Sequence, residues 1–368
     1  MNSVTALDKG SIHPTVPIFA AVLAVGEAKG IGGRDAMAAY LAGVEAVSRI
    51  ADALGERHFR SGFHNTATCG ALGAAAAAAR ALGLSSEKVA VALGIAGSGA
   101  AGLRDNFGTM MKPYHEGAAA RTGVMAAELA ARGFTASGTI LEASRGFFSA
   151  YGDGYDPAWF DRPLGDPWVF DSPGVWIKPY PSGMRTHPGM SAIAALRAEH
   201  GLTPDEVESI RVRTNQSVYN TLLHHRPEAG LQGKFSMEYC LAAVLAEGRA
   251  SLDAFTDAEV GRADLQDLLR RVEYTAYDAA EAQAEGYNNV TTLLELRLRD
   301  GRTLTARADS CKGSGDDPMS YAEIAAKVTD AGVSRGWQAD RMAALAEMVA
   351  KIETLDDIGA FGRVLRPE

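Results

Sequence analysis

The N-terminal part of the chain repeats apolar side chains at helical spacing, one segment after another. Residues 34–54 carry an apolar residue every three or four positions, and the pattern ends at Gly55. Similar Ala-rich segments, each followed by a glycine, cover residues 18–29, 71–82 and 117–132. The pattern predicts an all-helical body for this part of the chain.

The pattern changes near residue 150. Residues 151–174 are rich in Gly, Pro, Asp and aromatic side chains, which is typical of a loop or linker. Beyond them, β-branched or alternating stretches predict strands over residues 175–180, 207–214, 290–298 and 303–308. Asp300-Gly301, between the last two, is a strong hairpin signal. Helical patterns interleave at residues 190–200, 236–246 and 264–272, so the region predicts an α+β domain.

Helical patterns return near the C-terminal end, at residues 321–331 and 339–352. We expect a helical tail that follows an α+β insertion to pack back on the first domain. The predicted fold class is therefore mainly α with α+β. It consists of a large all-helical domain formed by both chain ends, residues 1–165 and 318–368, and an inserted smaller α+β lid domain, residues 170–317.

Composition narrows the class of partner. The 368 residues are 47% hydrophobic and 22% charged, as in an ordinary globular protein. The formal net charge of -9 argues against nucleic acid as a partner, because binding phosphates needs a basic field. It leaves a small anionic ligand open, since a few local cations are enough to bind one.

The sequence pattern shows neither a targeting signal nor a metal motif. The first residues have no basic region followed by an apolar one, and the longest apolar run, residues 71–79, is too short to cross a bilayer. We therefore expect a cytoplasmic protein with no membrane partner. Because Cys69, Cys240 and Cys311 are far apart and the histidines are scattered, we expect no metal site. Cys69 and Cys240 are predicted to be small core side chains.

Candidate chemistry is concentrated in stretches where His, Lys, Arg or Tyr stand among Gly, Pro or apolar residues. The main ones are SIHPTVP, SGFHNTATCGALG, GTMMKPYHEGAAARTG, WIKPYPSGMRTHPGM and GKFSMEYCLA. A single His-Pro or Lys-Pro pair is most often only a turn. Together, the stretches supply cations that can hold carboxylates and histidines that can move a proton. A helix that starts after His64 would add its N-terminal dipole to anion binding.

The stretch GTMMKPYHEG is predicted to be a Gly/Pro-bounded loop in front of the helix of residues 117–132. Lys112 is the cation of this stretch. The residues alone leave two interpretations of His115 and Glu116 open: they contribute to the site, or they cap the helix that follows.

These stretches resemble the MmgE/PrpD family in their order and spacing, over nearly the whole chain. The most specific matches are GFHNTATCGALGAAAAAARALGL, KPYPSGMRTH, KFSMEYCLAAVLAEG and the run from ALGIAGSG to AAELAARGF. The family includes 2-methylcitrate dehydratase, cis-aconitate decarboxylase and iminodisuccinate epimerase. The resemblance implies an enzyme without a cofactor, a homodimer, and a helical domain with an inserted α+β lid.

The resemblance also implies roles for individual residues. It implies catalytic roles for four residues that stand in matching motifs: His13, His64, Lys112 and Tyr239. It implies substrate binding by Lys178, in the K-x-[YF]-P segment. Arg185 and His187 are added as substrate-binding residues because they follow Lys178 on the same stretch.

The chain departs from the family pattern in two places. Relatives carry a longer N-terminal region and an A-L-D-x-D-D-[TG] motif before the His-Pro, whereas this chain has only Ala6-Leu7-Asp8 and then Lys9. Gly183 stands where relatives often have Cys or His. The first departure keeps a non-catalytic interpretation open, and the second leaves the identity of the substrate open.

The predicted function is a lyase, most simply a dehydratase that removes a proton next to a carboxylate on a small di- or tricarboxylic acid. The same groups would suit an epimerase or a decarboxylase of a related acid. A truncated homologue that binds a carboxylate without turning it over is the alternative of a different class. We expect a small polycarboxylate as substrate and a second copy of the chain as partner.

Overall fold

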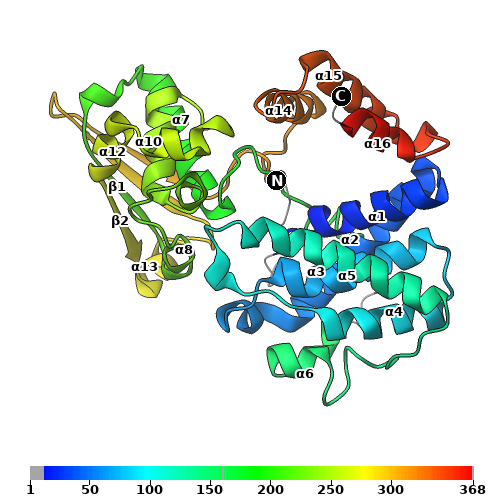
Figure 1. The fold of residues 1–368 in the computed structure, drawn as a ribbon. Helices are drawn as coiled ribbons and strands as arrows, with labels where there is room; N and C mark the ends of the chain where they lie inside the picture. Colours follow the sequence, from blue (N-terminus) through cyan, green and yellow to red (C-terminus); the bar gives the residue numbers. More distant parts are fainter. Residues whose placement is uncertain (1–11, 160, 162, 367–368) are drawn as a thin grey trace. The chain divides into compact units, whose positions relative to one another are not determined.

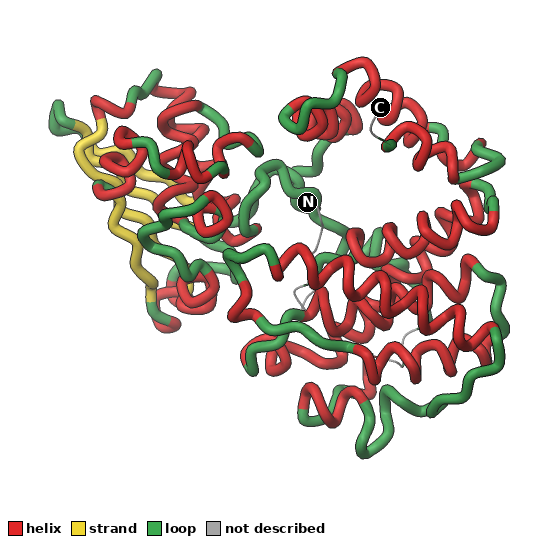
Figure 2. The backbone as a smooth tube through the Cα atoms, viewed as in Figure 1, coloured by secondary structure: helices red, strands yellow, loops and turns green. Residues whose placement is uncertain are grey.

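The computed structural model describes residues 12–159, 161 and 163–366, which fall into two compact units (Figure 1). The helical unit takes in the described parts of Met1–Asn106, Met111–Ile177 and Gln338–Glu368. The sheet unit takes in Phe107–Met110 and Lys178–Trp337. Figure 2 shows the described strands together, and all of them belong to the sheet unit.

The helical unit is built from α-helices and short 3-10 turns. Its α-helices are α1 (Thr15–Lys29), α2 (Gly33–Arg60), α3 (Asn65–Ala81), α4 (Ser86–Gly99), α5 (Met111–Ala131), α6 (Phe147–Gly152), α15 (Ala339–Ala350) and α16 (Gly359–Leu365). Its 3-10 turns are η1 (Arg104–Asn106), η2 (Pro157–Trp159) and η6 (Ile352–Thr354). The helices predicted at residues 18–29, 34–54 and 71–82 are confirmed as parts of α1, α2 and α3.

Helix α3 is the centre of the helical unit, because α1, α2, α4 and α5 all pack against it (Figure 1). Most of its residues from Asn65 to Ala79 are buried, and most of these are Ala or Gly. Small side chains let the neighbouring backbones come close. A Cβ added at Gly123 of α5 would lie 2.5 Å from the backbone carbon of Ala74, and one added at Gly73 would lie 2.6 Å from the Cβ of Val47.

Helix α5 begins at Met111, earlier than predicted, so the prediction of a loop in this stretch is wrong. Pro113 fits in the first turn because the N–H groups at a helix start have no partner inside the helix. Lys112, His115 and Glu116 are buried in the first two turns. Neither His115 nor Glu116 precedes the helix as a cap.

Gly55 interrupts α2 at the predicted place, but the helix resumes after it. The glycine has φ 67° and ψ -169°, which a residue without a Cβ adopts readily. His58, in the resumed part, is fully buried. Its Nε2 lies 2.7 Å from the Thr68 hydroxyl and its Nδ1 lies 3.0 Å from the Tyr151 carbonyl oxygen. Burial lowers the pKa of His58 from 6.5 to about 4.

The sheet unit combines four strands with short and long helices. Its strands are β1 (Val207–Asn215), β2 (Val272–Tyr277), β3 (Thr292–Leu298) and β4 (Thr303–Ala308). Its α-helices are α7 (His187–His200), α8 (Gln216–Thr221), α9 (Gly230–Gly233), α10 (Met237–Glu247), α11 (Asp257–Val260), α12 (Ala263–Arg270), α13 (Ala279–Ala284) and α14 (Tyr321–Val333). Three 3-10 turns complete it: η3 (Met184–Thr186), η4 (Pro204–Glu206) and η5 (Asp253–Phe255).

The strands form one mixed sheet in the order β2-β1-β3-β4. Strand β1 runs parallel to β2, with Ile210 opposite Val272, and antiparallel to β3. Strands β3 and β4 form the predicted hairpin, with Gly301 at φ 92° in its turn. The strands predicted at residues 207–214, 290–298 and 303–308 are therefore confirmed.

Two predictions in this unit are corrected by the structure. Residues 175–180 form no strand. Pro179 and the following Pro181 lack the N–H group that a paired strand donates. The helix predicted over residues 264–272 ends at Arg270, and Val272 begins β2, because burial beside β1 outweighs the helical pattern at this position.

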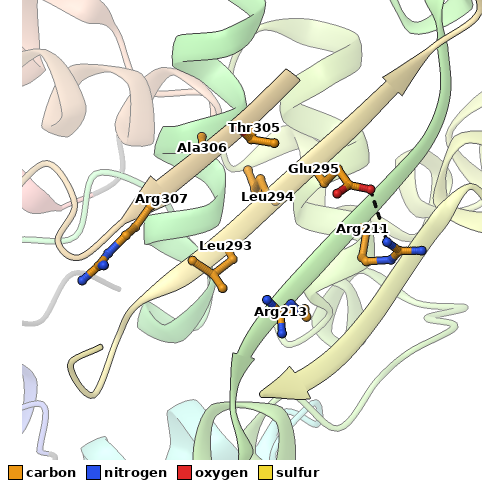
Figure 3. Close-up of a pocket in the computed structure, with 8 residues that line it drawn as sticks. All are labelled: Arg211, Arg213, Leu293, Leu294, Glu295, Thr305, Ala306 and Arg307. Atoms are coloured by element: carbon orange, nitrogen blue, oxygen red, sulfur yellow. Dashed lines mark hydrogen bonds and ion pairs between the residues drawn. The ribbon is translucent and has the colours of Figure 1, made fainter. Parts of the chain in front are cut away.

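Helices α7 and α10 pack on one face of the sheet. Ile210 and Leu296 are buried on this face, in one core with Met190 of α7. Alternate strand residues, including Arg211 and Glu295, lie on the opposite face and are exposed; Figure 3 labels both side chains. The sheet therefore has one buried and one exposed face.

The fold class predicted from the sequence, mainly α with α+β, is confirmed. Helices α15 and α16 group with the helical unit, and α14 groups with the sheet unit. The domain boundaries at residues 165, 170 and 318 stay predictions. Within the described ranges, none of the helices combines the length and the apolar character that crossing a bilayer needs.

Two alanine substitutions on α5 test the close packing against α3. We expect Gly123→Ala to lower the free energy of unfolding by about 1–3 kcal/mol, because the new methyl group meets the α3 backbone. Gly117 has no atom within 4 Å of an added Cβ. Gly117→Ala should therefore raise the free energy of unfolding by about 0.5–1 kcal/mol through helix propensity alone. Urea denaturation measures both, and equal effects would contradict the packing.

A second prediction concerns the contribution of His58 to the free energy of unfolding at acid pH. Its folded pKa lies below its unfolded pKa, so below about pH 6.5 the unfolded state binds a proton that the folded state excludes. The free energy of unfolding should fall as the pH drops from about 6.5 toward 4, by at most about 1.4 kcal/mol per pH unit for this group. His58→Gln should reduce the slope of the free energy of unfolding against pH. His200→Gln, at the exposed end of α7, should reduce this slope less. Equal slopes in the two variants would count against the assignment.

Candidate functional site

His64 precedes the first turn of α3, as its N-cap residue, and its side chain is buried. Its backbone N–H donates to the Gly102 carbonyl at 3.0 Å, and the Arg104 N–H donates to the Gly62 carbonyl at 2.9 Å. These two bonds fasten the segment before α3 to the segment before η1. His64 and Arg104 are brought together in this way, although forty residues separate them.

The His64 ring forms a hydrogen bond with the ring of His115. The two Nδ1 atoms are 3.1 Å apart, and both side chains are buried. Lys112 stands almost one turn before His115 on α5, and its Nζ donates to Glu116 at 3.3 Å. The starts of α3 and α5 therefore place two histidines and a lysine in one cluster.

The surroundings favour the neutral form of both rings. The pKa of His64 is held well below 6.5, mainly by burial and then by the charges of Lys112, His115 and Arg104. The pKa of His115 is also lowered, by burial and by Lys112, while Glu116 acts in the opposite direction. Two neutral imidazoles can share a hydrogen bond only if one donates and the other accepts.

Arg104 is a member of this cluster that the sequence analysis missed. Its guanidinium carbon lies 3.6 Å from the centre of the Phe59 ring, and Nη1 donates to the Phe59 carbonyl at 2.8 Å. Burial lowers the pKa of its guanidinium. Arg104 lies in the stretch GLRDNFG, inside the run that resembles the family, but no role was predicted for it; its position depends on the bond that joins its backbone to Gly62.

His13 is tied to the same end of α3 by its backbone. Its N–H donates to the hydroxyl of Thr66 at 3.0 Å, and Thr66 lies in the first turn of α3. The predicted acidic remnant Ala6-Leu7-Asp8 lies outside the described residues. The structure therefore connects the His13 backbone with the helix start that carries His64, and the catalytic role of the His13 ring stays a prediction.

Lys178 and His187 lie in the sheet unit. The Lys178 Nζ donates to the Ser182 carbonyl at 3.3 Å, and the Lys327 Nζ of α14 donates to the Lys178 carbonyl. His187 begins α7 and is fully buried. Its ring packs edge-on against the ring of Tyr180, with 5.4 Å between the two ring centres. Burial, followed by the charges of Lys178 and Lys327, holds the pKa of His187 well below its usual range.

Arg185 and Tyr239 make other contacts in the sheet unit. Arg185 donates to the Asn289 carbonyl at 3.1 Å. Tyr239 is fully buried, its ring lies 5.8 Å from that of Phe255, and its hydroxyl donates to the Ala254 carbonyl. Burial raises the pKa of this hydroxyl. A role in the core explains these contacts of Tyr239, and its catalytic role stays a prediction.

The cysteines are buried core residues, and the described residues form no group that could hold a metal ion. Cys69 and Cys240 are buried, as predicted, and burial raises the pKa of each thiol to about 12. In the part of the chain that the structure describes, no group of three or more His, Cys, Asp or Glu residues is placed to hold a metal ion. The cluster around His64 itself supplies imidazole, ammonium and guanidinium groups, with the Glu116 carboxylate beside Lys112.

A pocket on the open face of the sheet contains none of the predicted site residues (Figure 3). Its arginines are engaged with carboxylates. Arg211 bonds to Glu295 at 3.2 Å, and Arg213 bonds to Glu281 at 2.8 Å. Exposed, paired arginines of this kind contribute little to binding an anion, so the cluster around His64 is the better candidate site.

Comparison with known proteins connects both units with one family. The model of the MmgE/PrpD N-terminal domain matches residues 6–159, and that of the MmgE/PrpD C-terminal domain matches residues 180–352. The chain is 29% identical to the cis-aconitate decarboxylase of Homo sapiens over 96% of its own length and 74% of the relative's. It is 29% identical to that of Mus musculus, covering 96% and 73% of the two chains. It is 27% identical to that of Aspergillus terreus, covering 96% and 76%. The chain belongs to the MmgE/PrpD family.

Proposed function

We propose that the chain is a lyase that works without a cofactor on a small tricarboxylic acid and transfers a proton at a carbon next to a carboxylate. The observation that carries the proposal is the buried His64–His115 pair beside Lys112 and Arg104. The relatives that act on cis-aconitate support a tricarboxylate as the substrate. The predicted roles of His13, Lys178, Arg185, His187 and Tyr239 remain predictions within this proposal.

The charges of the cluster suit a polyanion. Lys112 and Arg104 can each hold a carboxylate, and the positive ends of α3 and α5 add to the attraction. A bound carboxylate would favour the protonated form of a nearby imidazole, since opposite charges raise a histidine's pKa. The cluster can therefore both bind the substrate and take up a proton when the substrate binds.

Among lyase reactions, the relatives favour decarboxylation. In that reaction the bond between carbon and a carboxyl group breaks, and carbon dioxide leaves. The electron pair left on carbon then takes a proton from a protonated imidazole, which regains a proton from water. His64 is the residue to which we assign this proton transfer.

Dehydration is the second candidate, because the family also contains dehydratases. In that reaction neutral His64 would accept the proton from the carbon next to a carboxylate, and the hydroxyl group would leave as water after protonation. Epimerisation would return the proton to the same carbon on the opposite face.

The proposal includes a homodimer in the cytoplasm.

Proton NMR in deuterated water tests the proposal with cis-aconitate, citrate, 2-methylcitrate and an amino-dicarboxylate. We expect cis-aconitate to lose carbon dioxide and to gain one deuteron on carbon. Loss of water from citrate or 2-methylcitrate would identify a dehydratase instead. Saturable binding of cis-aconitate without any turnover would favour the non-catalytic carboxylate binder. Absence of both binding and turnover across the panel would contradict the proposal.

A substitution at Lys112 tests the carboxylate contact. We expect Lys112→Met to lower kcat/KM about 100-fold, because a charge-assisted contact in a buried site is lost. Lys88→Met is a matched control, since Lys88 is exposed on α4 and donates to the Ala131 carbonyl. It should leave kcat/KM within about threefold, as expected for a surface change. Similar losses in both folded variants would refute a specific role of Lys112, and thermal unfolding checks the fold.

A further inference from the structure

We propose that His115 is the positioning residue of His64: its Nδ1 accepts the hydrogen of His64 Nδ1, so that Nε2 of His64 exchanges the proton with substrate. This inference rests on the proposed function, because it names how the proton-transferring residue of that site is oriented. It also makes a statement about the resting protein that needs no substrate to test.

The direction of the hydrogen bond follows from the surroundings of the two rings. The two Nδ1 atoms lie 3.1 Å apart, a hydrogen-bond distance, in a region where both side chains are buried. The better acceptor in such a pair is the more basic ring. His64 is the less basic one, because Lys112 and Arg104 add to the effect of burial. Glu116 partly offsets the effect of Lys112 on His115, which makes His115 the acceptor.

The titratable and charged groups around the pair come from three elements. Lys112 and Glu116 belong to α5, Arg104 belongs to η1, and His64 itself is the N-cap residue of α3. The starts of α3 and α5 add positive potential from their backbone dipoles. All of these groups except Glu116 disfavour adding a proton to the neutral pair, so a single hydrogen lies between the two Nδ1 atoms.

Gly102 lies close to both residues of the pair. It has φ 153°, and a Cβ added there would lie 2.4 Å from the Cβ of Ala67 and 3.5 Å from Cγ of His115. The same residue accepts the backbone N–H of His64 at 3.0 Å. Gly102 therefore lies beside the His115 ring and is bonded to the backbone of His64, and its lack of a side chain leaves room for the close approach of the two segments.

The consequence for catalysis concerns the tautomer of His64. Which ring nitrogen of a histidine carries the hydrogen is set by the hydrogen bond that the other nitrogen makes. A free imidazole side chain in water prefers its hydrogen on Nε2, which would block that atom as a base. With His115 as acceptor, the hydrogen of neutral His64 stays on Nδ1. Nε2 can then take up a proton when the substrate binds and give it to the carbon from which carbon dioxide has left. Nε2 regains a proton from water, so the proton count balances.

The first test is the tautomer of the two histidines in the whole protein. Histidine labelled with nitrogen-15 gives long-range proton–nitrogen correlations that distinguish a protonated from an unprotonated ring nitrogen. At pH 7.5 we expect His64 to carry its hydrogen on Nδ1 and His115 on Nε2. A hydrogen on Nε2 of His64 in the native protein would overturn the inference, whether or not the protein turns over cis-aconitate.

The second test compares two substitutions at His115. In His115→Asn, the amide oxygen can take the place of Nδ1 as acceptor, so kcat should remain within about tenfold of the native value. His115→Leu has no acceptor, so His64 should change its tautomer and kcat should fall about 100-fold, the low end of what general base catalysis contributes. KM should stay within about threefold in both, because Lys112 and Arg104 still bind the carboxylates.

The results separate this inference from the proposed function. If His64 has the expected tautomer but no acid of the panel is turned over, the proposed function fails and the orientation by His115 stands. If cis-aconitate is turned over and His115→Leu keeps both the tautomer and kcat, the inference fails and the function stands. If His115→Leu does not fold, the tautomer in the native protein and the Asn variant decide.

Discussion

The contact on which the candidate site depends is the close approach of α5 to the backbone of α3. This approach is possible because the facing residues, such as Ala74 and Gly123, carry little or no side chain. The two helices start beside each other for the same reason, so that His64 before α3 and His115 in the first turns of α5 come within hydrogen-bond distance. The packing of α3 against α5 therefore also sets the geometry of the site. A larger side chain between the two helices would separate the rings of His64 and His115.

Burial and positive charge act in the same direction in this site. Both lower the pKa of His64, and an anionic ligand would act against both. In the proposed function, the cluster would take up a proton together with a polyanion. The same combination, a buried histidine beside lysines, recurs at His187 with Lys178 and Lys327 in the sheet unit. Both units therefore place cations beside a neutral imidazole. Such cations are suited to binding carboxylates, and the relatives are named for an action on cis-aconitate.

Local patterns predicted most of the elements, whereas contacts between distant segments were predictable only in part. Helical periodicity identified α1, α2 and α3, and Asp300-Gly301 identified the hairpin of β3 and β4, because these signals act within a few residues. The strand expected at residues 175–180 failed because a strand also needs a partner. Motifs singled out His64 and Lys112, but no pattern shows that the Nδ1 atoms of residues 64 and 115 meet. Arg104 lies in a run that resembles the family but had no predicted role, and Lys327 stands in no motif, so only the folded backbone reveals their place.

The helical unit is assembled from segments that are far apart in the chain. Gly33 donates to the Leu355 carbonyl at 2.7 Å and Ile358 donates to the Ile31 carbonyl at 2.8 Å, so the loop between α1 and α2 is held by residues near the C-terminal end. During synthesis, α1 to α5 leave the ribosome long before these partners exist, whereas the sheet unit is almost one continuous segment. The sheet unit can therefore fold while the chain is still growing. The helical unit can close only after residues 355–358 have left the ribosome, and until then the surface of α1 that α16 covers is exposed.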